Sequence, residues 1–137
     1  MRIVAVKKAR FTVAALADDD AIEALDFILE APTDLKGSAA GMLALFSRYA
    51  EGGRQYLPTA VFHEANRQKG IWQFIKGRLR IFCFIDDGAL VILTHGAIKK
   101  SQKADPSEIR HAARLKAQYL AAKNRNELRW EEWTNDR

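Results

Sequence analysis

The chain has 137 residues, of which 48% are hydrophobic and 28% charged, and its formal net charge is +5 at pH 7. This length suits one domain with its own core, and the positive charge favours an anionic partner. No apolar run approaches the roughly 18 residues of a membrane-spanning helix, and the N-terminus has no signal-peptide pattern. The single cysteine, Cys83, excludes an internal disulfide. These features favour a reducing compartment, so we expect a cytoplasmic protein with no membrane partner.

The first half of the chain changes from strand patterns to helix patterns. Residues 2–6 and 10–16 are β-rich and are expected to be strands. In residues 21–30 the apolar side chains recur at helical spacing, and after Pro32 a second helical pattern covers residues 34–51. Because the connection is short, the two helices are expected to pack as an antiparallel hairpin. The sequence predicts that this hairpin covers the sheet through four buried side chains, Leu25, Ile28, Leu43 and Phe46.

The second half reads as a meander followed by a helix. Residues 54–70 contain many polar side chains and are expected to be irregular. Strand patterns follow at residues 71–75, 79–85 and 89–95, and Pro106 begins a last helix.

This order of elements indicates an α+β fold, a small, mainly antiparallel sheet packed against the N-terminal helical hairpin, with a C-terminal helix. We expect one domain over residues 1–124. The tail, residues 125–137, is expected to add a helical turn or to be a mobile end.

An Asp-Gly turn sets the expected register of the last two strands. Asp87 and Gly88 form a pair that favours a two-residue hairpin loop. That register pairs Arg80 directly with His95, at the rim of an apolar sheet face. The basic residues 99–103 follow at once, so cations and an imidazole would converge at one edge, which suits the handling of a phosphodiester.

Several segments of the second half resemble a known family. They are Gly70-Ile71-Trp72-Gln73-Phe74, Leu79-Arg80-Ile81-Phe82-Cys83-Phe84, and Leu93-Thr94-His95-Gly96-Ala97-Ile98-Lys99-Lys100-Ser101-Gln102-Lys103 followed by Pro106 and Glu108. They are similar to the HigB-type toxins of the RelE/ParE toxin–antitoxin superfamily, which includes phage-derived members. The His-Gly-x-x-Lys-Lys-x-x-Lys segment with a proline shortly after it is the most specific part of the resemblance.

The resemblance implies a RelE-like fold and a ribosome-dependent endonuclease that cleaves mRNA. The ribose 2′-OH would attack the adjacent phosphate, with neither a metal nor another cofactor. The implied partners are mRNA on the ribosome and a cognate antitoxin of helix-turn-helix type. Two alternatives use the same scaffold without nuclease chemistry, namely a gyrase-poisoning protein and a catalytically inactive binding protein of phage origin.

The candidate catalytic residues are Arg80, His95, Lys99 and Lys100. A guanidinium can clamp two phosphate oxygens, an imidazole can act as a base near neutral pH, and lysines can stabilise transition-state charge. The candidate RNA-binding residues are Lys76, Arg78, Lys103 and His63.

Each candidate also has a structural alternative. Arg80 would be a solvated strand end, the lysines a solvated charge run, and His95 a structural residue that caps the turn at Gly96. His63 lies in the irregular segment, where members of the family place mobile active-site loops. Cys83 is expected in the core, and His111, on the last helix, is expected at the surface.

Overall fold

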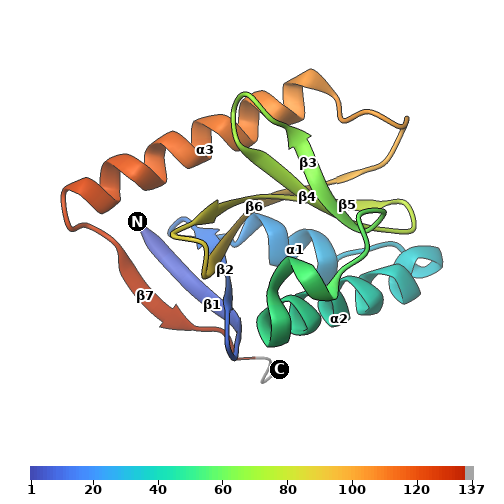
Figure 1. Cartoon of the computed structure of the whole chain (residues 1–137), viewed down its shortest axis with the longest axis horizontal. Coiled ribbons are helices and arrows are strands. Elements are labelled where there is room, and N and C mark those ends of the chain that lie inside the picture. Colours follow the sequence, from blue (N-terminus) through green and yellow to red (C-terminus); the bar gives the residue numbers. More distant parts are fainter. Residues whose placement is uncertain (135–137) are drawn as a thin grey trace.

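The computed structural model describes residues 1–134. Its strands are β1 (Arg2–Lys8), β2 (Thr12–Ala17), β3 (Phe62–Asn66), β4 (Ile71–Lys76), β5 (Leu79–Asp86), β6 (Leu90–Ile98) and β7 (Arg129–Glu132). Its α-helices are α1 (Glu23–Leu29), α2 (Lys36–Gly52) and α3 (Pro106–Asn124), with 3-10 turns at Thr33–Leu35 and Gly53–Tyr56. The strands form one sheet in the order β3-β4-β5-β6-β2-β1-β7, with α1 and α2 against one face and α3 against the other (Figure 1).

The sheet is mixed but largely antiparallel. Parallel pairing occurs between β2 and β6 and between β1 and β7, whereas the other neighbours are antiparallel. The prediction of an α+β fold with a mainly antiparallel sheet therefore agrees with the structure.

β7 lies in the expected tail, so the expectation of a helical turn or a mobile end is wrong for Arg129–Glu132. Its backbone pairs with β1, and Arg2 Nε lies 2.7 Å from Glu131 Oε2 across that pair.

β3 lies within residues 54–70, which the sequence predicts to be irregular, so that prediction is wrong for this strand. It is an edge strand with one fully buried side chain, that of Phe62, which stacks on Trp72 with ring centroids 5.0 Å apart. Its other side chains are partly exposed. A single buried aromatic leaves no alternation of apolar residues, so the strand gave no periodic signal.

β5 is covered on both faces. Leu79, Ile81 and Cys83 belong to the core beneath α1 and α2, whereas Phe82 and Phe84 pack toward α3. A strand buried on both faces reads as a continuous apolar run rather than an alternating one. Burial raises the pKa of the Cys83 thiol well above its usual value, and the prediction that Cys83 is a core residue is confirmed.

The helices on the first face supply most of the expected core. Leu25, Ile28 and Phe46 are buried, as the sequence predicts, but Leu43 is only half-buried. α1 packs against β2 and β6, and α2 crosses β1, β2 and β4. Together they leave the opposite face of the sheet to α3.

The register of β5 and β6 differs from the prediction at two points. The loop has three residues, 87–89, and β6 contains a bulge at Thr94. Each irregularity shifts the pairing by one residue, so Arg80 pairs with Ala97, and His95 pairs with Phe82. The predicted direct pairing of Arg80 with His95 is wrong. Because two shifts of one residue restore the alternation, both side chains still point toward the α3 face.

A polar contact ties α3 to the β5–β6 hairpin. Tyr119 Oη donates to Asp86 Oδ2 at 2.6 Å, and Lys123 Nζ lies 2.9 Å from the same oxygen. Burial works to raise the pKa of Asp86, but these two donors outweigh it and the pKa is lowered. The contact fixes the C-terminal half of α3 over the sheet.

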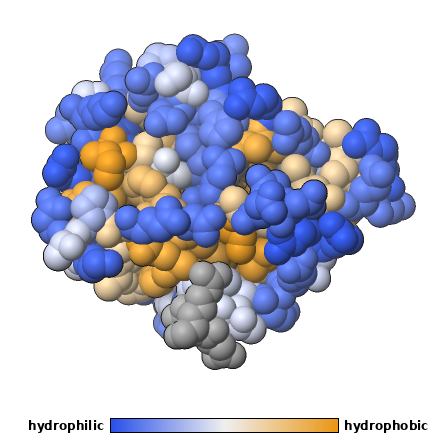
Figure 2. Space-filling view, turned by 180° about the vertical axis from the view of Figure 1, so that it is seen from behind, coloured by the Kyte–Doolittle hydropathy of each residue, from blue (hydrophilic) through white to orange (hydrophobic). Residues whose placement is uncertain are grey.

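The surface seen from behind is mainly hydrophilic, with apolar patches between the polar side chains (Figure 2). Large apolar side chains are exposed at Leu29, Tyr56, Leu120 and Trp130, and scattered residues of this kind are usual on soluble domains. Within residues 1–134, no helix is long and apolar enough to cross a membrane.

Candidate nucleic-acid interface

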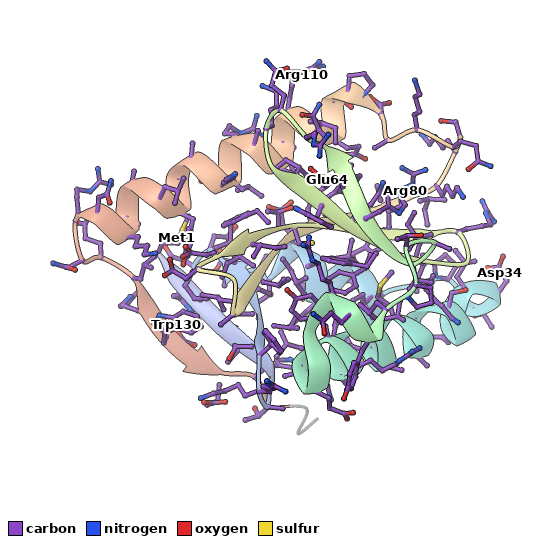
Figure 3. All side chains as sticks on the ribbon, viewed as in Figure 1. Met1, Asp34, Glu64, Arg80, Arg110 and Trp130 are labelled. Atoms are coloured by element: carbon purple, nitrogen blue, oxygen red, sulfur yellow. The ribbon has the colours of Figure 1, made fainter. Side chains whose placement is uncertain are left out.

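Arg80 lies inside the protein rather than at a rim. It projects from β5 toward the loop between β6 and α3, and is only 2% exposed (Figure 3). One terminal nitrogen donates to Gln73 Oε1 at 3.1 Å, and the other donates to the carbonyls of Ser101 and Gln102 at 2.6 and 2.9 Å. Arg80 therefore anchors the loop formed by residues 99–105, which we call the basic loop.

The Nε of Arg80 is the only buried side-chain nitrogen or oxygen in the described part of the chain that lacks a hydrogen bond. An unpaired buried donor costs about 1–3 kcal/mol. Burial lowers the pKa of the guanidinium, but an arginine still keeps its charge. The loop thus rests on a buried cation with one unused donor.

His63 lies on β3, not in an irregular segment as predicted. Its Nδ1 is 2.8 Å from the Thr59 carbonyl, which can only accept, so Nδ1 carries the proton and donates. Its Nε2 then accepts from Gln73 Nε2 at 3.0 Å. Since Gln73 Oε1 accepts from Arg80, a continuous chain of hydrogen bonds joins β3, β4, β5 and the basic loop.

The predicted cations do not all share one face. Lys100, Lys103 and Arg78 are exposed, and Lys99 is half-buried, with its backbone N–H donating to the Arg78 carbonyl at 2.6 Å. Lys76 is exposed at the end of β4 and lies along α2 at Gly41. It is therefore on the side of the sheet away from Arg80.

Two hollows flank the basic loop. The larger hollow, of about 640 Å³, lies over β3, β4 and the start of α3, and its polar lining is His63, Glu64, Asn66, Lys69, Gln73, Gln102, Lys103 and Arg110. The smaller hollow, of about 380 Å³, lies over β5 and the end of β6, and its charged lining is Arg80, Lys100, Lys103, Asp105 and Glu108. Lys103 borders both. Figure 3 labels Glu64 and Arg110 at the larger hollow and Arg80 at the smaller one.

His95 is 5% exposed and faces α3. Its Nε2 lies 3.2 Å from Glu108 Oε1, its Nδ1 lies 3.1 Å from Thr94 Oγ1, and its ring stacks on Phe82. Burial lowers the pKa of His95, the neighbouring His111 adds to that effect, and Glu108 opposes both. Glu108, rather than His95, reaches the smaller hollow.

His111 lies on α3 with its side chain 27% exposed. Its ring centroid lies 4.4 Å from that of His95. Arg114 donates to its Nδ1 at 2.5 Å, so its Nε2 carries the proton and donates to Glu23 Oε1 at 3.0 Å. This imidazole links α3 to α1 beside the His95–Glu108 pair.

Two residues of the site, Gln73 and Glu108, are not among those predicted from the sequence. Gln73 is a polar residue within an otherwise apolar strand, and that exception was a usable signal. Glu108 sits in the first turn of α3, where an acid is common for reasons of helix stability alone. No local pattern indicates that Glu108 contacts His95.

Comparison with known proteins sets these features in a family. Residues 26–117 match the family described as phage-derived protein Gp49-like, which covers more than half of the chain. The chain belongs to the Gp49-like family. The basic loop, both hollows and the His95–Glu108 pair fall within the matched region.

Other comparisons of this Gp49-like protein are weaker. Among solved structures, it is similar to a chain from the toxin–antitoxin complex RelBE2 of Mycobacterium tuberculosis, at 17% sequence identity and a TM-score of 0.36. That match covers 74% of this chain and 97% of the other. No curated protein matches the sequence.

Proposed function

We propose that this Gp49-like protein is a HigB-type toxin of a type II toxin–antitoxin system and an endonuclease that cleaves mRNA on the ribosome. The observation that carries the proposal is the gathering of cations around the basic loop. Lys69, Lys103 and Arg110 border the larger hollow, and Arg80 and Lys100 border the smaller one. Adjoining hollows lined by cations suit consecutive phosphates of a single strand.

The roles follow from position and charge. In the proposed reaction, Arg80, Lys99 and Lys100 stabilise negative charge on the phosphorane, because they lie on or beneath the basic loop. Lys103 and Arg78 bind the RNA backbone, and His63 contacts RNA in the larger hollow. Lys76, on the other side of the sheet, has no part in this site. The protein acts in the cytoplasm, where ribosomes are, and a helix-turn-helix antitoxin inhibits it.

One observation favours a second function, that of a binding protein without nuclease chemistry, including a gyrase poison. The terminal nitrogens of Arg80 donate to protein carbonyls and to Gln73. A guanidinium occupied in this way acts as a structural anchor, and the basic loop above it would then serve only to bind an anionic or acidic partner.

Induced expression separates the two functions. We expect growth arrest and new mRNA 5′ ends by primer extension, and we expect those ends to vanish when translation is blocked beforehand. The double variant Lys100→Ala/Lys103→Ala should lose both effects. Lys36→Ala, at the exposed start of α2, is the matched control and should keep them. Growth arrest without mRNA cleavage would favour the binding protein, and absence of both would refute the toxin.

A further inference from the structure

Glu108 is the acidic side chain best placed for chemistry in the smaller hollow. It lies in the first turn of α3, and its side chain is 33% exposed. Oε1 faces the Nε2 of His95 at 3.2 Å, whereas Oε2 makes no hydrogen bond within residues 1–134. The same hollow is lined by Arg80 and Lys100. One carboxylate oxygen is therefore held from behind, and the other is left for a ligand.

The contact with Glu108 defines the role of His95 Nε2. The contact between Nε2 and the Glu108 carboxylate needs a proton, since two acceptors would repel each other. The hydroxyl of Thr94 donates to the Phe82 carbonyl at 3.1 Å, and its oxygen lies 3.1 Å from Nδ1 of His95. Burial is the main cause of the lowered pKa of His95. Nε2 of His95 is thus a buried donor that orients Glu108 from the protein interior.

The groups that surround this pair come from three elements. β6 supplies His95 and Thr94, and α3 supplies Glu108 and His111. Glu23 of α1 reaches His111, not His95, at 3.0 Å. Glu108 is accordingly the one carboxylate of this cluster that lines a hollow together with cations.

We propose that Glu108 is the general base of this site and that the substrate is a ribose 2′-hydroxyl next to a phosphodiester. This inference rests on the proposed nuclease function and goes beyond it by naming the base. Glu108 Oε2 takes the proton of the 2′-OH as the 2′-oxygen bonds to phosphorus. The bond from phosphorus to the 5′-oxygen breaks, and that oxygen takes a proton from the Lys100 ammonium. The products are a 2′,3′-cyclic phosphate and a free 5′-hydroxyl.

His95 is then a positioning residue. It does not touch the substrate, because its ring lies between Phe82 and His111 and its Nε2 is directed at Glu108. It holds the carboxylate in one orientation, which is how a buried hydrogen-bond partner raises the effectiveness of a catalytic group.

The test is single-turnover cleavage of mRNA on programmed ribosomes at saturating protein. Glu108→Gln keeps an acceptor for His95 but cannot take the proton, so the rate should fall by roughly 10²–10⁴-fold. Glu30→Gln, a carboxylate at the exposed end of α1, is the matched control and should cut at the wild-type rate. Thermal unfolding of each variant checks that the fold is kept.

Chemical rescue distinguishes a base from a structural residue. Glu108→Ala opens space in the hollow. Sodium formate should raise the cleavage rate of this variant at least tenfold, whereas sodium chloride at equal ionic strength should not. His95→Phe should slow the saturated rate with unchanged ribosome binding, and formate should not rescue it. If the wild-type protein cleaves mRNA and Glu108→Gln cleaves equally fast, Glu108 is not the base, while the nuclease function stands. Absence of cleavage by the wild-type protein would overturn the nuclease function and the base together.

Discussion

The burial of Arg80 leads to a specific expectation for the Arg80→Met variant. Methionine fills a similar length of buried space but cannot donate to Gln73 Oε1 or to the carbonyls of Ser101 and Gln102. The two hydrogen bonds to the Ser101 and Gln102 carbonyls are the side-chain contacts through which β5 holds the basic loop, and the third joins β5 to Gln73 of β4. We expect the fold to survive and the loop to open.

The magnitude follows from the hydrogen bonds. Three bonds from a charged donor are worth about 1.5–3 kcal/mol each, or about 5–9 kcal/mol together. Part of this loss of stability is offset, because the substitution removes a buried charge with an unpaired Nε and because the loop carbonyls can bind water. We therefore expect the free energy of unfolding to fall by only about 1–3 kcal/mol. Local opening of the loop should become about 10–100-fold more frequent, at about 1.4 kcal/mol for each factor of ten.

Limited trypsin digestion measures this opening directly, because Lys99, Lys100 and Lys103 lie in the loop. When opening and closing are fast, the cleavage rate follows the population of the open form. Mass spectrometry should show cleavage after these lysines about 10–100-fold faster in Arg80→Met than in the wild-type protein, in proportion to the more frequent opening of the loop. Arg78→Met, an exposed arginine in the adjacent turn, is the control and should leave that rate unchanged. If Arg80→Met also leaves it unchanged, Arg80 does not anchor the loop.

Four further outcomes are expected. Phe46→Ala should lower the free energy of unfolding by about 3–5 kcal/mol, and Leu43→Ala, at a half-buried position, by clearly less, as measured in urea. Tyr119→Phe should cost about 1.5–3 kcal/mol, because it removes a hydrogen bond to an ionised carboxylate. The pKa of Asp86 is lowered on folding, so its contribution to stability is present above about pH 4 and is lost as the pH falls below that value. Between pH 6 and pH 2, the free energy of unfolding should therefore fall less in Asp86→Asn than in the wild-type protein. Lys103→Ala should weaken ribosome binding with a shallower salt dependence and leave the saturated cleavage rate nearly unchanged, whereas a changed rate at saturation would place Lys103 in the chemical step.

Periodicity was enough to predict the elements that bury a regular face. The strands of the meander, both N-terminal strands and all three α-helices lie close to where the apolar spacing puts them. β3 and β7 were missed because edge strands bury few side chains. All four residues of β7 are exposed, so its place depends on backbone pairing and on Arg2, which lies 127 positions before Arg129 in the sequence. Local patterns cannot report a pairing between distant segments.

The candidate site was predictable in composition but not in geometry. The sequence indicated that cations gather near the end of β6, but it gave no measure of depth, so Arg80 was expected at a rim instead of beneath the basic loop. The Asp87-Gly88 pair identified the hairpin correctly and its loop length incorrectly. The bulge at Thr94 has no local signature, and it decides that His95 meets Glu108.

The pairing of β1 has a consequence for how the protein is made. β1 and β2 form a hairpin early in the chain, yet Thr12 of β2 pairs with Leu90, and Arg2 of β1 pairs with Arg129. During translation the hairpin therefore leaves the ribosome with both edges unpaired, and each edge waits for a segment made much later. Such distant contacts slow folding, and open edges invite pairing with other chains. A ribosome that stalls within α3 would hold the nascent protein with the β1 edge still open to any strand nearby.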